Sequence, residues 1–135
     1  MSRYVDSTEQ LVTEIVVKDM KSSLDFYQRL GFDLLRDGGD FVELTWEDHR
    51  LFLAELSAFH DAHGASLPTS PPFPFANVRV MVPNVDEYWN LANEIGAQII
   101  IPLADRYYGL RDFTIADLDG FGIRFASLIP GEIQS

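Results

Sequence analysis

The sequence predicts an α+β fold built from two β-α-β-β-β modules. Three observations support this prediction: a pattern repeats at an offset of 65 residues, strand segments alternate apolar and polar residues, and a glycine follows each helical segment. Residues 11–35 match residues 76–100 in the order of these features, although few residues are identical. Because self-similarity at a fixed spacing indicates repeated structural units, we expect one such unit in each half of the chain.

The first strand of each unit shows an alternation with a period of two, which is typical of a strand with one buried face. In the first unit, one face is expected to carry Thr13, Ile15 and Val17, and the other Val12, Glu14 and Val16. In the second unit, an apolar face formed by Val78, Val80 and Val82 is opposed by Asn77, Arg79 and Met81. Both strands are therefore expected to pack one face on a helix and leave the other for a different purpose.

The ends of the two helices have recognisable signals. Ser22 or Ser23 is expected to cap the first helix, and Asn84, with a glutamate three residues later, predicts a capping-box start for the second. The residue expected to end each helix in the left-handed conformation is a glycine: Gly31 and Gly96.

After each helix, three further strands are predicted, separated by turn signals such as Gly38-Gly39 and the Asp-Leu-Asp-Gly stretch at 117–120. The segment between the halves holds four of the seven prolines and no apolar periodicity, which indicates a linker. We therefore expect a single domain, residues 1–135, made of a module at 10–56, a linker at 57–74 and a module at 75–128.

The composition limits the classes of partner. Acidic residues outnumber basic ones by 21 to 10, so the formal net charge of −11 argues against nucleic-acid binding. No apolar run approaches the roughly 20 residues that a membrane span needs. The chain has no cysteine, which excludes disulfides and thiolate metal sites. The polar, acidic N-terminus is unlike a secretory signal, so we expect a cytoplasmic protein.

Two stretches resemble the vicinal oxygen chelate superfamily, which includes glyoxalase I, extradiol dioxygenases and the fosfomycin- and bleomycin-resistance proteins. They are "VKDMKSSLDFYQRLGF" at 17–32 and "YGLRDFTIADLDGFGIRF" at 108–125, and the second is most similar to the bleomycin-resistance branch. The resemblance covers roughly residues 10–128. It implies the glyoxalase/bleomycin-resistance fold, in which the modules form a curled mixed sheet around a cavity, and it implies a homodimer.

The resemblance also implies four places for metal ligands, one on each of four strands and usually His, Gln or Glu. In this sequence those places correspond to Val12, Glu55, Asn77 and Arg124. Valine has no lone pair, the asparagine amide is a weak donor, and arginine is a permanent cation. Because a divalent site needs three or four N/O donors, we predict no metal, no cofactor and no catalytic residue of that type.

Fixed ion pairs are expected to replace the metal. The strand pattern that directs residues 12 and 77 towards the cavity also directs Glu14 and Arg79 there, at equivalent positions of the two halves. Glu55 and Arg124 would form a second pair in the vacated metal place. Pairing offsets the desolvation that neither charge tolerates alone. The alternative is that these charges only fill a narrow interior without a ligand.

Aromatic residues at strand ends and in loops supply the rest of a candidate pocket. Trp46, Tyr107 and Tyr108 are expected to form its wall and to stack on a planar or cationic ligand. Three more candidates border the linker: Phe59, Phe73 and Phe75. The pair His60 and His63 has a spacing that suits a metal on a helix, but its Gly-, Pro- and Ser-rich surroundings favour a solvated loop.

The function predicted from these features is that of a metal-independent binding protein of the bleomycin-resistance kind. It would sequester an aromatic or cationic small molecule in a dimeric cleft, and sequestration needs affinity but no catalytic residue. One alternative is an enzyme: a lyase, transferase or dioxygenase with an unorthodox metal site at Glu55, or a metal-free isomerase with Glu14 or Glu55 as base. Another is an accessory partner protein whose cavity has lost its use.

Overall fold

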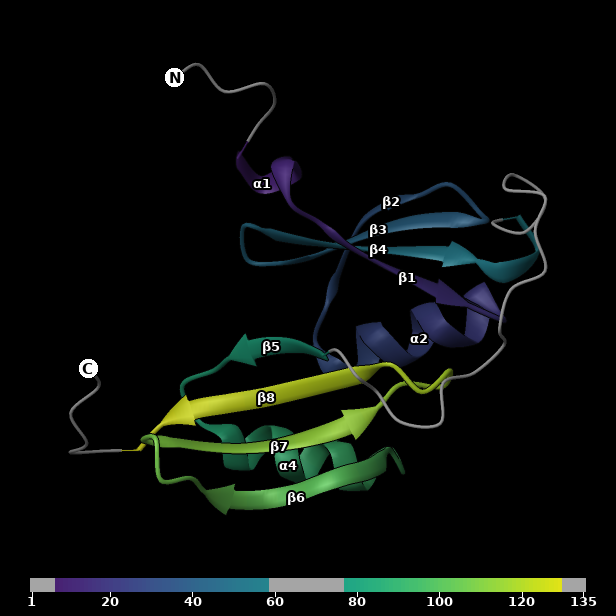
Figure 1. The fold of residues 1–135 in the computed structure, drawn as a ribbon. Coiled ribbons are helices and arrows are strands. Elements are labelled where there is room, and N and C mark those ends of the chain that lie inside the picture. The colour runs from purple at the N-terminus through teal and green to yellow at the C-terminus, as the bar shows by residue number, and fades with distance from the viewer. Residues whose placement is uncertain (1–6, 59–76, 130–135) are drawn as a thin grey trace. The chain divides into compact units, whose positions relative to one another are not determined.

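The computed structural model describes residues 7–58 and 77–129, which fall into two compact units, one within residues 1–69 and the other within 70–135. Figure 1 shows the elements of both units, and each unit is described by itself. Most of the expected linker lies outside the described residues, together with Phe59, Phe73 and Phe75 and the pair His60 and His63.

The first unit is a four-stranded mixed sheet with one main helix. A short helix α1 (Ser7–Gln10) precedes the elements β1 (Thr13–Val17), α2 (Met20–Leu30), β2 (Asp33–Asp37), β3 (Phe41–Trp46) and β4 (His49–Glu55). The strand order is β1-β4-β3-β2, in which β1 and β4 are parallel and the other neighbours are antiparallel.

The second unit repeats this arrangement. Its elements are β5 (Asn77–Met81), α4 (Val85–Glu94), β6 (Gln98–Asp105), β7 (Leu110–Ala116) and β8 (Gly122–Leu128). The strand order is β5-β8-β7-β6, again with one parallel pair, β5 and β8. The α+β class and the two β-α-β-β-β modules are thus confirmed, whereas the cavity between the modules stays a prediction.

One face of each sheet packs on its helix and forms the core of the unit. In the second unit, α4 lies against the sheet (Figure 1), and the ring of Tyr88 stacks on Phe125 with 4.9 Å between centroids. The strands contribute fully or almost fully buried side chains to this side: Val80, Phe113, Ile115, Ile123 and Phe125. The first unit is built likewise, with Ile15, Val17, Leu44 and Leu53 on the sheet and Tyr27 and Leu30 on α2. The predicted alternation of both first strands is therefore confirmed.

The start of α2 differs from the prediction. The helix begins at Met20 after the N-cap Asp19, so the expectation that Ser22 or Ser23 caps it is wrong. Ser22 lies inside the first turn, where its hydroxyl donates a hydrogen bond of 2.8 Å to the Asp19 carboxylate. The physical reason is that the chain turns into the helix directly after β1, which leaves no room for a later start.

The N-cap of α4 and the glycines after both helices are confirmed, whereas the reciprocal glutamate bond of a capping box stays a prediction. Asn84 is the N-cap of α4, and its side-chain oxygen accepts a hydrogen bond of 3.2 Å from the N–H of Asp86. Gly31 ends α2 with φ of 117°, and Gly96 follows α4 with φ of 73°, both in the left-handed region that glycine adopts without strain. A positive φ at Gly120 likewise accompanies the predicted turn into β8.

Candidate functional site on the second sheet

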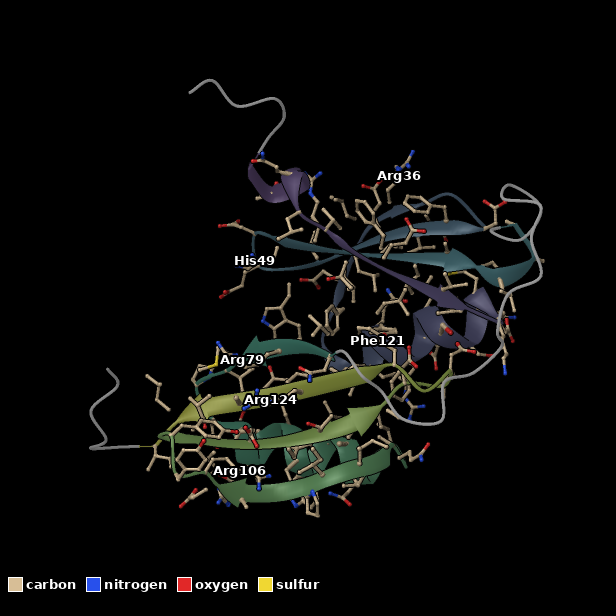
Figure 2. All side chains as sticks on the ribbon, viewed as in Figure 1. Arg36, His49, Arg79, Arg106, Phe121 and Arg124 are labelled. Carbon is tan, nitrogen blue, oxygen red and sulfur yellow. The ribbon has the colours of Figure 1, made fainter. Side chains whose placement is uncertain are left out.

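The candidate site lies on the face of the second sheet that is turned away from α4. In the parallel pair of β5 and β8, Arg79 is the register partner of Arg124, and Thr114 of β7 is the partner of Arg124 on its other side. Since neighbours along a strand point to opposite faces and Phe125 packs on α4, Arg124 points away from the helix. Figure 2 labels the three arginines of this region, Arg79, Arg106 and Arg124.

A buried aspartate holds two of these arginines in place. The Nε and Nη2 atoms of Arg124 donate to Oδ2 of Asp112 at 3.0 and 2.5 Å. The Nε of Arg106 donates to the other carboxylate oxygen, Oδ1, at 2.7 Å, and its Nη2 donates to the carbonyl oxygen of Pro102. The Asp112 side chain is 4% exposed, whereas those of Arg106 and Arg124 are 25% and 22% exposed. One carboxylate thus fixes two guanidinium groups.

Tyr108 completes this cluster. Its hydroxyl donates to Oδ2 of Asp112 at 3.0 Å and accepts a hydrogen bond of 2.7 Å from Nη2 of Arg124. The Cζ atom of Arg124 lies 5.7 Å from the centre of the Tyr108 ring, within the range of a cation–π contact. The neighbouring Tyr107 meets this ring edge to face at 5.1 Å, and its own side chain is fully exposed.

The charges of the cluster do not cancel and leave it with a net positive charge. Burial alone would raise the pKa of Asp112, but the hydrogen bonds from Arg106, Arg124 and Tyr108 outweigh it and hold that pKa below its ordinary value. Burial, followed by the hydrogen bond to Asp112, raises the pKa of Tyr108, so the phenol stays protonated at neutral pH. Two guanidinium groups and one carboxylate sum to +1, and the adjacent Arg79 makes the sum +2.

The predicted site residues of the first unit do not share one face. Glu14 on β1 is exposed and is the register partner of Phe52, whereas Glu55 is the partner of Val17, which is fully buried on the side of α2. The Oε2 of Glu55 accepts a hydrogen bond of 3.2 Å from the N–H of Met20, the first residue of α2. Its Oε1 accepts a hydrogen bond of 3.0 Å from the hydroxyl of Ser57. Glu55 therefore acts locally at the start of the helix.

Trp46 also lies on the helix side of the first sheet. It follows the alternation of Val42 and Leu44, which are fully buried, and its ring meets the edge of Phe32 at 5.0 Å. The expected ion pairs, Glu14 with Arg79 and Glu55 with Arg124, would each join the two units, so both stay predictions. Within its own unit, Arg124 pairs with Asp112.

The residues do not fit the metal site that the family resemblance implies. In the repeat, Glu14 faces Phe52 as Arg79 faces Arg124, so the residue of β4 that corresponds to Arg124 is Phe52, which has no donor atom. Asn77 offers only a neutral amide, and the cation of Arg124 is fixed by an ion pair. Within residues 7–58 and 77–129 no group of three or more His, Cys, Asp or Glu side chains is placed to hold a metal. We therefore derive no chemistry through a metal.

Two residues of the cluster were not predicted from the sequence: Asp112, which holds Arg124 together with Tyr108, and Arg106, which binds the other carboxylate oxygen of Asp112. A signal for Asp112 is present in "LRDFTIA" (110–116), where an acidic residue lies next to Phe113 and therefore on the opposite face of a mostly buried strand. A charge at such a buried strand position needs a partner. Arg106 lies beyond the end of β6, and no sequence pattern connects it to Asp112.

Comparison with known proteins identifies the family. Residues 9–125 match the model of the Glyoxalase/Bleomycin resistance protein/Dioxygenase superfamily. Among curated proteins the chain has no match. None of the helices in the described ranges is both long and apolar enough to span a membrane.

Several solved structures share the fold. A glyoxalase/bleomycin resistance protein/dioxygenase from Nocardioides is 18% identical, with a TM-score of 0.76 over 97% of this chain and 90% of that one. A hypothetical protein from S. aureus is 24% identical, with a TM-score of 0.75 over 88% and 93% of the two chains. TioX from Micromonospora sp. ML1 is 25% identical, with a TM-score of 0.67 over 88% and 98%.

Proposed function

The chain belongs to the Glyoxalase/Bleomycin resistance protein/Dioxygenase superfamily, and from that premise we propose that it is a metal-independent binding protein for an aromatic small molecule. The observation that carries the proposal is Arg124. The family resemblance implies a metal ligand at its position, and the buried Asp112 fixes its cation there. A guanidinium in a metal place repels a divalent ion, but it provides a rigid polar anchor for an organic ligand.

The surroundings of Arg124 support an aromatic ligand. Tyr108 contacts Arg124, and the exposed ring of Tyr107, which meets the Tyr108 ring, offers a flat apolar surface. Stacking on such rings binds planar molecules with little loss of side-chain entropy. The proposal includes sequestration in the cleft of a homodimer, as the family resemblance implies. Analytical ultracentrifugation tests that part, and a monomer at the concentrations used for binding would contradict it.

The test is a thermal-shift screen of the full chain against a panel of neutral, anionic and cationic aromatic compounds, run with and without EDTA. A ligand that binds only the folded state raises the unfolding temperature by mass action, so a true ligand gives a shift that grows with its concentration. We expect such shifts to be the same in EDTA. Binding that EDTA abolishes would overturn the proposal, as would about one tightly bound transition metal per chain by elemental analysis.

A further inference from the structure

We propose that Arg79 and Arg124 form an anion site that binds the carboxylate of an aromatic acid, with the ring of Tyr108 beside it. The inference rests on the proposed function and specifies its ligand, because it assigns a negative charge to the group that meets the arginines. The sequence predicts an aromatic or cationic ligand. The proposal keeps the aromatic part of that prediction and replaces the cation with an anion.

Both arginines still have N–H groups available for a ligand. Arg79 is exposed, and its side chain makes no hydrogen bond or ion pair with the described residues of its unit. Arg124 uses Nε and Nη2 to contact Asp112 and Tyr108, while its Nη1 has no hydrogen-bond partner in the described part of the chain. The planar fork of a guanidinium matches the two oxygens of a carboxylate, and hydrogen bonds between ionised groups are the stronger ones.

The positive charge of the arginines is only partly compensated. Arg79 and Arg124 face each other in the register of β5 and β8, and like charges directly opposite in a sheet repel. Asp112 neutralises one guanidinium of its cluster and leaves the other uncompensated. On this face of β5, β7 and β8, Asp112 is the only acidic residue, so a bound anion would relieve the repulsion. The negative charge elsewhere on the protein is screened beyond about 8 Å at physiological ionic strength.

The Arg124 side chain is held rigidly. The hydrogen bonds that Arg124 donates to Asp112 and Tyr108 fix its side chain before any ligand arrives. A flexible surface arginine loses rotamer freedom on binding, whereas a fixed one has already lost it. The rings of Tyr107 and Tyr108 are placed to meet the aromatic part of an acid whose carboxylate reaches the guanidinium groups.

The arrangement is tested with three probes of nearly equal shape and different charge: naphthoate, naphthamide and naphthylmethylammonium. Their affinities for the full chain are measured by isothermal titration calorimetry in EDTA at physiological ionic strength. Hydrogen bonds between ionised groups are stronger than those to a neutral amide, so naphthoate is expected to bind about tenfold or more tightly than naphthamide. The ammonium probe is expected to bind most weakly, and added salt to weaken naphthoate selectively.

Two variants locate the effect. Arg79→Gln is expected to weaken naphthoate about tenfold and to leave naphthamide unchanged, and because Arg79 is exposed the variant should fold. Arg111→Gln removes the same charge from the opposite face of the sheet, where Arg111 pairs with Asp86 and Asp105, and is expected to change neither affinity. Equal losses in both variants would overturn the site, since they would indicate only a general effect of net charge.

The outcomes separate the two proposals. If the neutral or cationic probe binds as tightly as naphthoate, the anion site is wrong and the metal-independent aromatic binding protein stands. If naphthoate does not bind, the anion site is wrong, and the compound panel in EDTA decides the proposed function independently. A selective shift of the Arg124 Nε–H resonance on addition of naphthoate would place the carboxylate at this residue.

Discussion

The two modules have the same strand order and the same helix-facing cores but differ on the other face of the sheet. Where the second module has Arg79 beside Arg124, the first has Glu14 beside Phe52. Phe52 meets the ring of Phe41 at 5.2 Å, so this part of the first sheet is partly aromatic. The helix side of each sheet thus carries the apolar residues that hold its module together, whereas the opposite side differs between the modules and is free to acquire a function.

The largest expected effect tests whether the helix side of the sheet stabilises the fold while the opposite side does not. Phe125 is fully buried on the helix side of β8, next to Arg124 in sequence, and it stacks on both Tyr88 and Phe113. Phe125→Ala should lower the free energy of unfolding by about 3–5 kcal/mol, because it removes buried apolar surface and leaves a cavity. Urea denaturation followed by circular dichroism measures the loss.

The matched control for this prediction is Arg79→Ala on the opposite face of the same sheet. Surface substitutions without special contacts stay within about 0.5 kcal/mol, so this variant should be nearly as stable as the wild type. Similar losses for Phe125→Ala and Arg79→Ala would contradict the separation of a stabilising face from a binding face.

The next effect concerns the buried aspartate that has no charged counterpart on the first sheet. Asp112→Asn removes the negative charge between Arg106 and Arg124 and leaves both guanidinium groups without it. Breaking a fully buried pair costs about 3–5 kcal/mol, and because both arginines are partly exposed we expect about 2–3 kcal/mol. Asp105→Asn, at a carboxylate that is 61% exposed, is the control and should have little effect in the same urea titration.

The pH dependence of this effect follows from the lowered pKa of Asp112. A carboxylate with a lower pKa in the folded than in the unfolded state stabilises the fold above the unfolded pKa, which is about 4, and loses that contribution as the pH falls through the folded pKa. The difference in unfolding free energy between wild type and Asp112→Asn should therefore be constant near neutral pH and shrink below about pH 4. A difference that grows on acidification would contradict the assignment.

The fold was predictable from the sequence because its signals are local and repeated. Apolar alternation around Ile15 and Val80 marks strands with one buried face, and Gly31 and Gly96 end the helices as expected. Each of these signals depends on residues close in sequence, and the repeat supplied every one of them twice. The start of α2 was missed because the group that binds its first N–H, Glu55, is 35 residues away.

The candidate site was only partly predictable. Asn77, Arg79, Arg124 and Tyr108 were singled out, and the register places Arg79 beside Arg124. Within its unit, Arg124 pairs with Asp112. No local pattern links these two residues, because they lie on neighbouring strands, β7 and β8, and are diagonal neighbours rather than register partners. Glu55 looked like a ligand because a carboxylate near a strand end suits one, but the register with Val17 directs it to the helix.

The smallest expected effect compares how the two helices begin. Asn84 caps α4 from within its own segment, whereas Glu55 reaches the first N–H of α2 from β4. Asn84→Ala should cost about 1 kcal/mol of unfolding free energy. Glu55→Ala should cost a similar amount, and Glu55→Gln about half of it, because glutamine keeps an acceptor and loses only the charge at the helix N-terminus. Urea denaturation of the three variants orders these effects. If Glu55→Ala leaves stability unchanged but abolishes ligand or metal binding, Glu55 belongs to the binding site, and the first module contributes chemistry that its helix-side contacts do not explain.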